Sequence, residues 1–286
     1  MSGKVTRRQC VAAIGAAAIV SQVGLSKLAR AQVRIRHSGA ANAQYHGNAT
    51  MQQFWDEVKI RTNGEVQIET FWGTLGGEAT LLNGVGLGTL ESYQGAYTGM
   101  PEFDVFYMAD MFRDYDHAVK AINGPLRPKL TKMLEDKYKA HLLGVGRAGS
   151  FGLMTKDKLN SWADVRNKKI RVGPILGILE TAKALGANGV PIAFNEVYTA
   201  LQQGVVDGQI TLNTLVVSQK YYEVVKHWIR QELGLGFDKV VIAQSAWNRI
   251  KPEQQKLISD LFVEWERTRW FPPVRKTFRP LPSSKV

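Results

Sequence analysis

Strand-like and helix-like hydrophobic patterns follow one another along the body of the chain. Polar and apolar residues alternate at 33–36 and again at 66–71, as in half-buried strands. Large apolar residues recur at helical spacing within 48–60, and Asn63-Gly64 then supplies a helix-ending glycine. The order strand, helix, strand predicts a β-α-β unit with parallel strands.

A second alternating set begins near residue 141. Short strands are predicted at 142–145, 169–172 and 209–212, with helical patterns between them. Residues 81–90 contain three glycines, which makes this stretch a poor isolated helix on propensity alone. Strands that alternate with helices over the whole body predict an α/β fold, and the two sets indicate two lobes.

The N-terminal segment has the pattern of an export signal. The pair Arg7-Arg8 precedes an apolar stretch at 11–20, and Ala29-Arg30-Ala31 supplies the small-x-small pattern of a cleavage site. We therefore predict that export removes residues 1–31. An N-terminal anchor helix is the alternative, although the apolar run is short for a span of about 20 residues. The sequence leaves both the general and the twin-arginine export routes open.

The positive charge of the chain is concentrated at its two ends. The 286 residues carry a formal charge of +12. Residues 1–31 hold five basic residues and residues 267–286 hold six, with no acidic residue in either segment, so 32–266 retain only +1. A nearly neutral body has no excess charge to neutralise phosphates, which argues against nucleic acid as a partner.

Motifs for metal, cofactor and catalytic chemistry are missing from the sequence. The only cysteine, Cys10, falls within the predicted signal, and the five histidines are scattered. We therefore predict no disulfide, no metal site and no bound cofactor. Residues 144–149 fit G-x-G-x-x-G, but the residues after them resemble a strand rather than a helix. We interpret the motif as a glycine-rich strand or hinge rather than as a dinucleotide site.

Arg171 is the most suggestive side chain of the body. It lies in a predicted strand between Ile170 and Val172, and Gly173-Pro174 ends this strand just after Val172. Ligands of open α/β sheets sit beyond the carboxyl ends of strands, and a guanidinium can grip a carboxylate in bidentate fashion. Position alone leaves open whether Arg171 pairs with an internal acid or with an anionic ligand.

Five segments stand out in order over residues 33–266: 71–78 (FWGTLGGE), 111–118 (MFRDYDHA), 170–172 (IRV), 195–209 (NEVYTALQQGVVDGQ) and 220–226 (KYYEVVK). Together they resemble one family, the DctP-like solute-binding proteins of TRAP transporters.

The resemblance implies a two-lobed α/β periplasmic binding protein with a ligand cleft between the lobes. Its expected role is to capture an organic acid in the periplasm and deliver it to the membrane permease subunits, without catalysis. An exported α/β enzyme acting on a small organic acid is the alternative. A third possibility is a member that folds poorly because its C-terminal region departs from the family.

The resemblance also assigns candidate ligand-binding residues. The ligand-carboxylate arginine of the family falls on Arg171, and an aromatic residue that packs against the ligand falls on Phe194. His37 and Glu78 fall on loop positions of the first lobe that face the cleft. These assignments move the interpretation of Arg171 toward ligand binding.

Two of the binding positions depart from the family pattern. Thr211 falls where many members carry an asparagine, and either Thr211 or Asn213 is expected to replace that polar contact. Phe151 falls where many members carry a second arginine. Because a phenyl ring covers apolar surface and cannot pair with a second carboxylate, we predict a monocarboxylate with some apolar character in preference to a C4-dicarboxylate.

The same resemblance divides the chain. Residues 32–148 are expected to form the first lobe, 149–236 the second, and 237–270 a return to the first lobe. Residues 271–286 form a basic tail rich in proline, for which we predict no regular packed structure.

Overall fold

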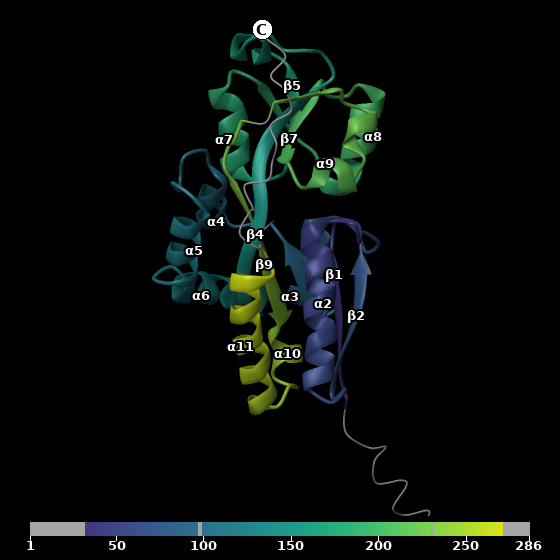
Figure 1. Cartoon of the computed structure of the whole chain (residues 1–286), viewed down its shortest axis with the longest axis vertical. Coiled ribbons are helices and arrows are strands. Elements are labelled where there is room, and N and C mark those ends of the chain that lie inside the picture. Colours follow the sequence, from purple (N-terminus) through teal and green to yellow (C-terminus); the bar gives the residue numbers. More distant parts are fainter. Residues whose placement is uncertain (1–31, 97–98, 230, 271–286) are drawn as a thin grey trace, which may run out of the picture.

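The computed structural model describes residues 32–96, 99–229 and 231–270. The predicted export signal at 1–31 and the basic tail at 271–286 lie outside the described residues. Figure 1 shows two α/β lobes stacked along the long axis of the molecule, with helices packed beside strands in each. The predicted two-lobed α/β fold is confirmed.

Strands and helices alternate along most of the chain (Figure 1). The strands are β1 (Val33–Gly39), β2 (Val66–Trp72), β3 (Ser92–Gly95), β4 (Ala140–Thr155), β5 (Lys169–Val172), β6 (Asn188–Pro191), β7 (Gly208–Leu212), β8 (His227–Ile229) and β9 (Leu235–Ala243). The α-helices are α2 (His46–Arg61), α3 (Glu78–Leu87), α4 (Pro101–Asp104), α5 (Tyr115–Asn123), α6 (Arg127–Tyr138), α7 (Leu176–Ala184), α8 (Val197–Gln203), α9 (Leu215–Ser218), α10 (Gln244–Trp247) and α11 (Pro252–Thr268). Short 3-10 helices are η1 (Val105–Tyr107), η2 (Trp162–Val165), η3 (Phe194–Glu196) and η4 (Tyr221–Glu223).

One path of hydrogen-bonded strands runs through both lobes. Its order is β2-β1-β3-β9-β4-β7-β5-β6, and β8 pairs with β4 off this path. β1 and β2 are parallel, as the β-α-β pattern predicts. The long strand β4 pairs with β9 through its first part and with β7 through its last part. β4 therefore connects the two lobes.

The glycine-rich motif at 144–149 lies inside β4 and serves packing. A Cβ on Gly144 would lie 2.1 Å from Cε1 of Phe262, and one on Gly146 would lie 2.5 Å from Cδ2 of Trp270. Gly149 has φ +107°, and the β4–β9 register shifts between Arg147 and Gly149. The interpretation of the motif as a glycine-rich strand is confirmed. The absence of side chains at Gly144 and Gly146 makes room for the rings of Phe262 and Trp270.

Tertiary packing overrides local propensity in α3. It contains Gly84 and Gly86, but Leu81, Leu82 and Val85 are buried on one side. The helix ends at Gly88, whose φ of +73° suits glycine. The hydrophobic core thus forms a helix where propensity alone predicts a poor one.

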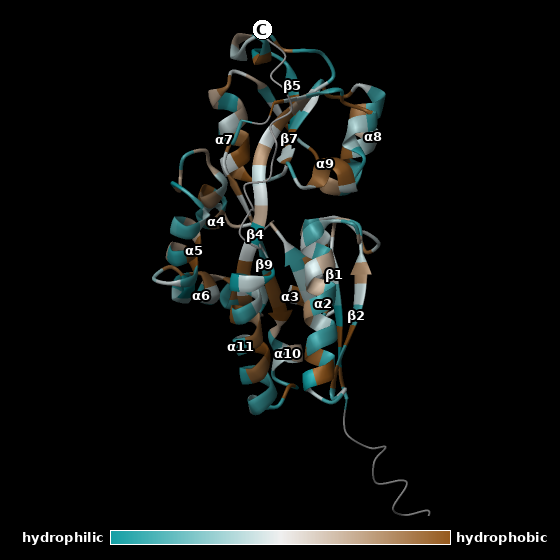
Figure 2. Ribbon diagram, in the orientation of Figure 1, coloured by the Kyte–Doolittle hydropathy of each residue, from teal (hydrophilic) through white to brown (hydrophobic). Residues whose placement is uncertain are grey.

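Aromatic side chains hold the main helices of the first lobe together. Phe54 of α2 contacts Phe262 and Trp265 of α11 edge to face, with ring centroids 5.5 and 5.9 Å apart. Figure 2 shows hydrophobic residues along the strands at the centre and hydrophilic residues on the outer turns of the helices. Within the described ranges, no helix combines the length and apolar character that crossing a membrane requires.

Candidate functional site

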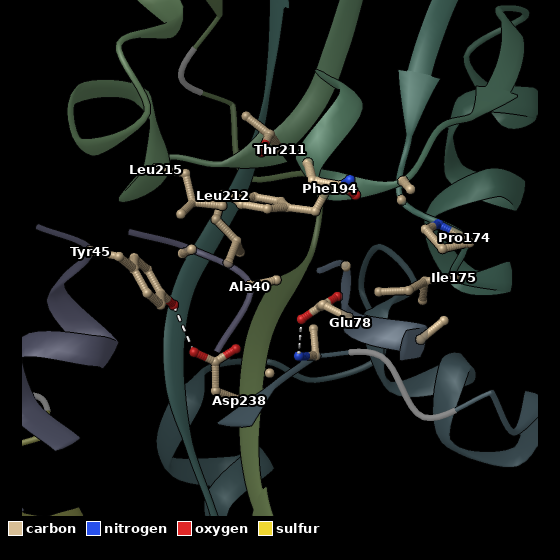
Figure 3. Close-up of a pocket in the computed structure, with 18 of the residues that line it drawn as sticks. Ala40, Tyr45, Glu78, Pro174, Ile175, Phe194, Thr211, Leu212, Leu215 and Asp238 are labelled. Atoms are coloured by element: carbon tan, nitrogen blue, oxygen red, sulfur yellow. Dashed lines mark hydrogen bonds between the residues drawn. The ribbon is translucent and has the colours of Figure 1, made fainter. Parts of the chain in front are cut away.

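A cavity of about 320 Å³ is lined by residues of both lobes. Figure 3 shows Phe194, Thr211 and Leu215 on the side of the second lobe, with Glu78 and Asp238 facing them from the first. Pockets of this kind, apolar with a few convergent polar groups, are the usual form of small-molecule sites.

Arg171 brings a buried positive charge to this cavity. It belongs to β5, and its exposed fraction is 4%. The strand ends one residue later at Val172, and Gly173-Pro174 follow at the edge of the cavity. Its Nε and Nη2 atoms donate hydrogen bonds to the carbonyl oxygen of Ile192, at 3.1 and 2.8 Å. These bonds to a carbonyl of the same lobe hold the guanidinium plane in place.

The buried charge of Arg171 lacks an acidic partner within the described part of the chain. Among the residues that the structure describes, no carboxylate forms an ion pair with it, and burial lowers its pKa, opposed by smaller effects of Tyr221 and Glu78. A buried charge is costly unless it is paired. An anion placed in the cavity beside Arg171 would supply the missing partner.

Apolar side chains cover the second-lobe side of the cavity. Phe194 follows β6 in η3, and Leu212 and Leu215 follow from β7 and α9. Phe151 of β4 lines the same space and meets Tyr107 edge to face, with ring centroids 6.3 Å apart. These surfaces can bury the carbon skeleton of a ligand.

Glu78 starts α3 and faces the cavity from the first lobe (Figure 3). Its Oε1 atom accepts hydrogen bonds from the backbone N–H of Ala96 at 2.8 Å and from the hydroxyl of Tyr93 at 3.1 Å. A carboxylate at a helix N-terminus is also favoured by the helix dipole. The side chain is therefore held in a fixed position at the floor of the cavity.

Asp238 of β9 is the second carboxylate of the floor. Its Oδ2 atom accepts hydrogen bonds from the hydroxyl of Tyr45 at 2.8 Å and from Nε2 of Gln94 at 3.5 Å. Burial, together with the charge of Glu78, raises the pKa of Asp238 to about 6. Burial lowers the pKa of the neighbouring Lys239 to about 8.

Five of the seven sequence-predicted site residues line this cavity: Arg171, Phe194, Thr211, Phe151 and Glu78. The structure places the other two, His37 and Asn213, outside its lining.

His37 is buried inside the first lobe. Its Nδ1 atom lies 2.7 Å from Oγ of Ser92, and its ring meets Trp55 and Trp72 edge to face. Burial lowers the pKa of His37 to about 3, so the ring is neutral at physiological pH. As a neutral ring packed between two indoles, His37 serves the core.

Asn213 lies just past the end of β7. Its Nδ2 atom donates to Oγ of Ser150 at 3.0 Å, and its Oδ1 atom accepts from Nε1 of Trp228 at 3.0 Å. Thr211, two residues earlier, is buried in the strand and lines the cavity. Of the two polar replacements considered from the sequence, the geometry favours Thr211.

Sequence analysis did not identify three polar residues of the floor: Tyr45, Gln94 and Asp238. One signal was present for Asp238. The pair Asp238-Lys239 interrupts an otherwise apolar stretch that extends to Ala243, and β9 buries both side chains. Buried charges inside a strand are rare unless they have a specific role.

Hydrogen bonds join residues of the two lobes at more than one place. Nδ2 of Asn42 donates to the carbonyl oxygen of Ser218 at 2.6 Å. Elsewhere, Oδ2 of Asp104 accepts from the backbone N–H of Leu176 at the start of α7, at 3.0 Å. The lobes are therefore in direct contact around the cavity.

Comparisons with known proteins agree on one family. The model for bacterial extracellular solute-binding protein, family 7 (DctP) matches residues 35–270. A solute-binding protein of Roseobacter denitrificans is 26% identical over 253 residues, which are 87% of this chain and 75% of the relative.

Solved structures show the same fold. A TRAP periplasmic solute-binding protein from Desulfovibrio salexigens, with bound orotic acid, has a TM-score of 0.78 and 26% identity, covering 82% of this chain and 78% of that one. Another from Haemophilus influenzae, with bound L-gulonate, has a TM-score of 0.76 and 26% identity, covering 83% and 79%.

Proposed function

This chain belongs to the bacterial extracellular solute-binding protein family 7, and from that membership we propose that it captures a small organic acid through Arg171 and delivers it to the membrane permease subunits of a TRAP transporter. The chain is a periplasmic binding protein and not an enzyme, as its family and its structural relatives are binding proteins. The alternative of an exported enzyme is therefore set aside.

The state of Arg171 is the observation that carries the proposal. The guanidinium is buried, held by the carbonyl of Ile192, and without an ion-pair partner among the described residues. A ligand carboxylate would form charge-assisted hydrogen bonds with the remaining donors. We propose that Phe194, Phe151, Thr211 and Glu78 contact the rest of the same ligand.

We further propose that the ligand is a monocarboxylate. Among the described residues of the lining, Arg171 is the only basic one, whereas Glu78, Glu196 and Asp238 are acidic. A second carboxylate would meet like charges at short range, which disfavours it strongly in a buried site. Orotic acid and L-gulonate, bound by the two structural relatives, each carry a single carboxyl group, which supports the choice.

Calorimetry on the purified chain tests the function. We expect saturable binding of orotate or L-gulonate and weaker binding of succinate. Arg171→Ala should remove about 2–5 kcal/mol of binding free energy, since it leaves the ligand carboxylate unpaired. Arg171→Lys should not restore binding, because an ammonium lacks the planar fork of donors.

Lys169→Ala is the matched control, because Lys169 lies on the same strand with its side chain exposed. It should bind as the wild type does. Undiminished affinity in the Arg171→Ala protein would rule out the anchor. Tighter binding of succinate than of either monoacid would rule out the monocarboxylate preference.

A further inference from the structure

The cavity that would receive an anionic ligand is itself lined by an excess of acidic side chains. Its described lining holds one basic residue, Arg171, against the acidic residues Glu78, Glu196 and Asp238. Glu196 is exposed, so water screens its charge, whereas the exposed fraction of Asp238 is 4%. A ligand carboxylate adds a further negative charge to this space. Neutralising a carboxylate of the floor would offset that repulsion.

Asp238 is the floor carboxylate whose charge receives less support. The hydrogen bonds to its Oδ2 atom come from uncharged donors, the hydroxyl of Tyr45 at 2.8 Å (Figure 3) and Nε2 of Gln94 at 3.5 Å. The second of these is at the long end of the ordinary range. Burial, and after it the charge of Glu78, therefore raises the pKa of Asp238 in spite of both bonds.

Glu78 differs from Asp238 in each of these respects. Its Oε1 atom accepts from the backbone N–H of Ala96 and from the hydroxyl of Tyr93, and its side chain is half-buried. It also occupies the first turn of α3, where the helix dipole favours a negative charge. Of the two carboxylates of the floor, Asp238 is therefore the one that gains more from a proton.

The nearest basic residue compensates the charge of Asp238 only in part. Lys239 follows it on β9, and consecutive side chains of a strand point to opposite faces. The Nζ atom of Lys239 donates to the carbonyl oxygen of Gly95 at 3.1 Å, and the side chain lines a separate small cavity beside Phe103. Asp104 of α4 also acts on its charge. Lys239 lowers the pKa of Asp238 less than burial raises it.

The histidine and the tyrosines around Asp238 stay neutral near pH 6. Burial lowers the pKa of His37 of β1 to about 3, so the ring that interacts with Gln94 carries no charge. Burial also raises the pKa values of the surrounding tyrosines well above their usual range: Tyr45, Tyr93 and Tyr107. Asp238 is thus the group of this cluster that is poised to change its charge near pH 6.

We propose that the protein takes up a proton from solvent when it binds its anionic ligand, and that the carboxylate of Asp238 accepts this proton. The inference rests on the proposed function, because it takes the ligand to be an anion held by Arg171. An O–H bond forms on Asp238, which becomes a neutral carboxyl group, and the ligand is unchanged. Because binding and protonation support each other, the protein holds its ligand more tightly as the pH falls.

The pH window follows from the ligand-free protein. The pKa of Asp238, about 6 without ligand, rises further when a negative charge enters the cavity, because like charges disfavour the ionised form. Well below pH 6 the carboxyl is protonated before and after binding, so the uptake disappears. If the ligand raises this pKa by about one pH unit, the uptake is about 0.5 proton at pH 6.5 and below about 0.1 at pH 5.

Calorimetry with orotate and with L-gulonate measures the uptake directly. Each acid keeps a single negative charge from about pH 5 to about pH 8. The binding enthalpy is measured at one pH in PIPES, bis-tris and imidazole, and its slope against the ionisation enthalpy of the buffer gives the number of protons taken up. We expect about 0.5 proton at pH 6.5, and an affinity at least about 5-fold higher at pH 5.5 than at pH 7.5.

Three variants assign the proton to its acceptor. Asp238→Asn is neutral at every pH, so the uptake at pH 6.5 should vanish and the affinity should change less than about 2-fold from pH 5.5 to 7.5. Tyr45→Phe removes a donor that supports the charged form, so the pH of maximal uptake should rise by at least about 0.5 unit. Asp56→Asn is the control, because Asp56 is exposed on α2; it should keep the wild-type uptake. Far-UV circular dichroism verifies that each variant is folded.

The outcomes separate this inference from the proposed function. If neither acid binds the wild type, or if binding survives Arg171→Ala, the proposed function fails and the proton uptake fails with it. If the acids bind through Arg171 but the enthalpy does not depend on the buffer between pH 5.5 and 7, only the proton uptake fails. Uptake that persists in Asp238→Asn would overturn the assignment of Asp238 as the acceptor.

Discussion

Replacing Gly144 by alanine should destabilise the protein through a single, well-defined collision. The new Cβ would lie 2.1 Å from Cε1 of Phe262, whereas ordinary contacts begin near 3.4 Å. The ring cannot easily withdraw, because it is fully buried between Phe54 and Trp270, each with a ring centroid 5.5 Å away. Strand or ring must therefore move by more than about 1 Å, and overpacking of this kind costs about 1–3 kcal/mol.

Thermal and urea denaturation, followed by circular dichroism, measure the effect. A loss of that size lowers the Tm by about 2–12 °C in a protein of this length. Gly173→Ala is the matched control, since its Cβ would meet nothing closer than 3.8 Å. Phe262→Leu should relieve part of the penalty. The double variant should therefore lose less free energy of unfolding than the two single variants lose in sum.

A Gly144→Ala protein as stable as the wild type would contradict this account of the glycine-rich motif. So would strict additivity with Phe262→Leu, because two residues that collide must couple. In either case the glycines of β4 would need another explanation.

Two other predictions follow from the groups around the cavity. Folding raises the pKa of Asp238 to about 6, so the folded protein keeps a proton on this carboxyl that the unfolded chain loses near pH 4. The ligand-free wild type should therefore lose roughly 3 kcal/mol of stability relative to Asp238→Asn as the pH rises from about 4 to 6. A stability difference between the two proteins that stays constant across this pH range would contradict the prediction. Asp104→Ala removes the acceptor for the Leu176 N–H at the lobe contact and should weaken ligand binding about 3–10-fold by disfavouring the closed lobes; unchanged affinity by calorimetry would show that this contact does not bear on closure.

The sequence predicts the architecture well where one periodicity dominates. The alternating segments and the helix between them become β1, α2 and β2 with the expected parallel pairing. Prediction fails where distant packing decides. α3 forms despite its glycines because Leu81, Leu82 and Val85 find a core to enter, and that core is built by strands and helices far away in the sequence.

The predictable part of the site is the part with a local signature. Arg171 stands out because it is a charged residue near the end of an apolar strand that Gly173-Pro174 terminates. His37 also lies in a strand, but the face it occupies is decided by Trp55 and Trp72, which no local pattern connects to it. Gln94 of β3 meets Asp238 of β9 only after the two strands have paired, and Tyr45 reaches Asp238 from α2, so their grouping depends on long-range topology.

The two lobes contribute chemically different halves to the cavity. The second lobe supplies the guanidinium of Arg171 and the ring of Phe194, whereas the first supplies the acceptors Glu78 and Asp238. An acid with a donor at its far end can satisfy both halves only while the lobes are together, because neither half is complete alone. Differential affinity for the closed state is what allows a ligand to shift a conformational equilibrium. Contact of the ligand with both halves and closure of the cavity would then be one event, and an acid too short to span the cavity would bind to Arg171 without holding the lobes closed.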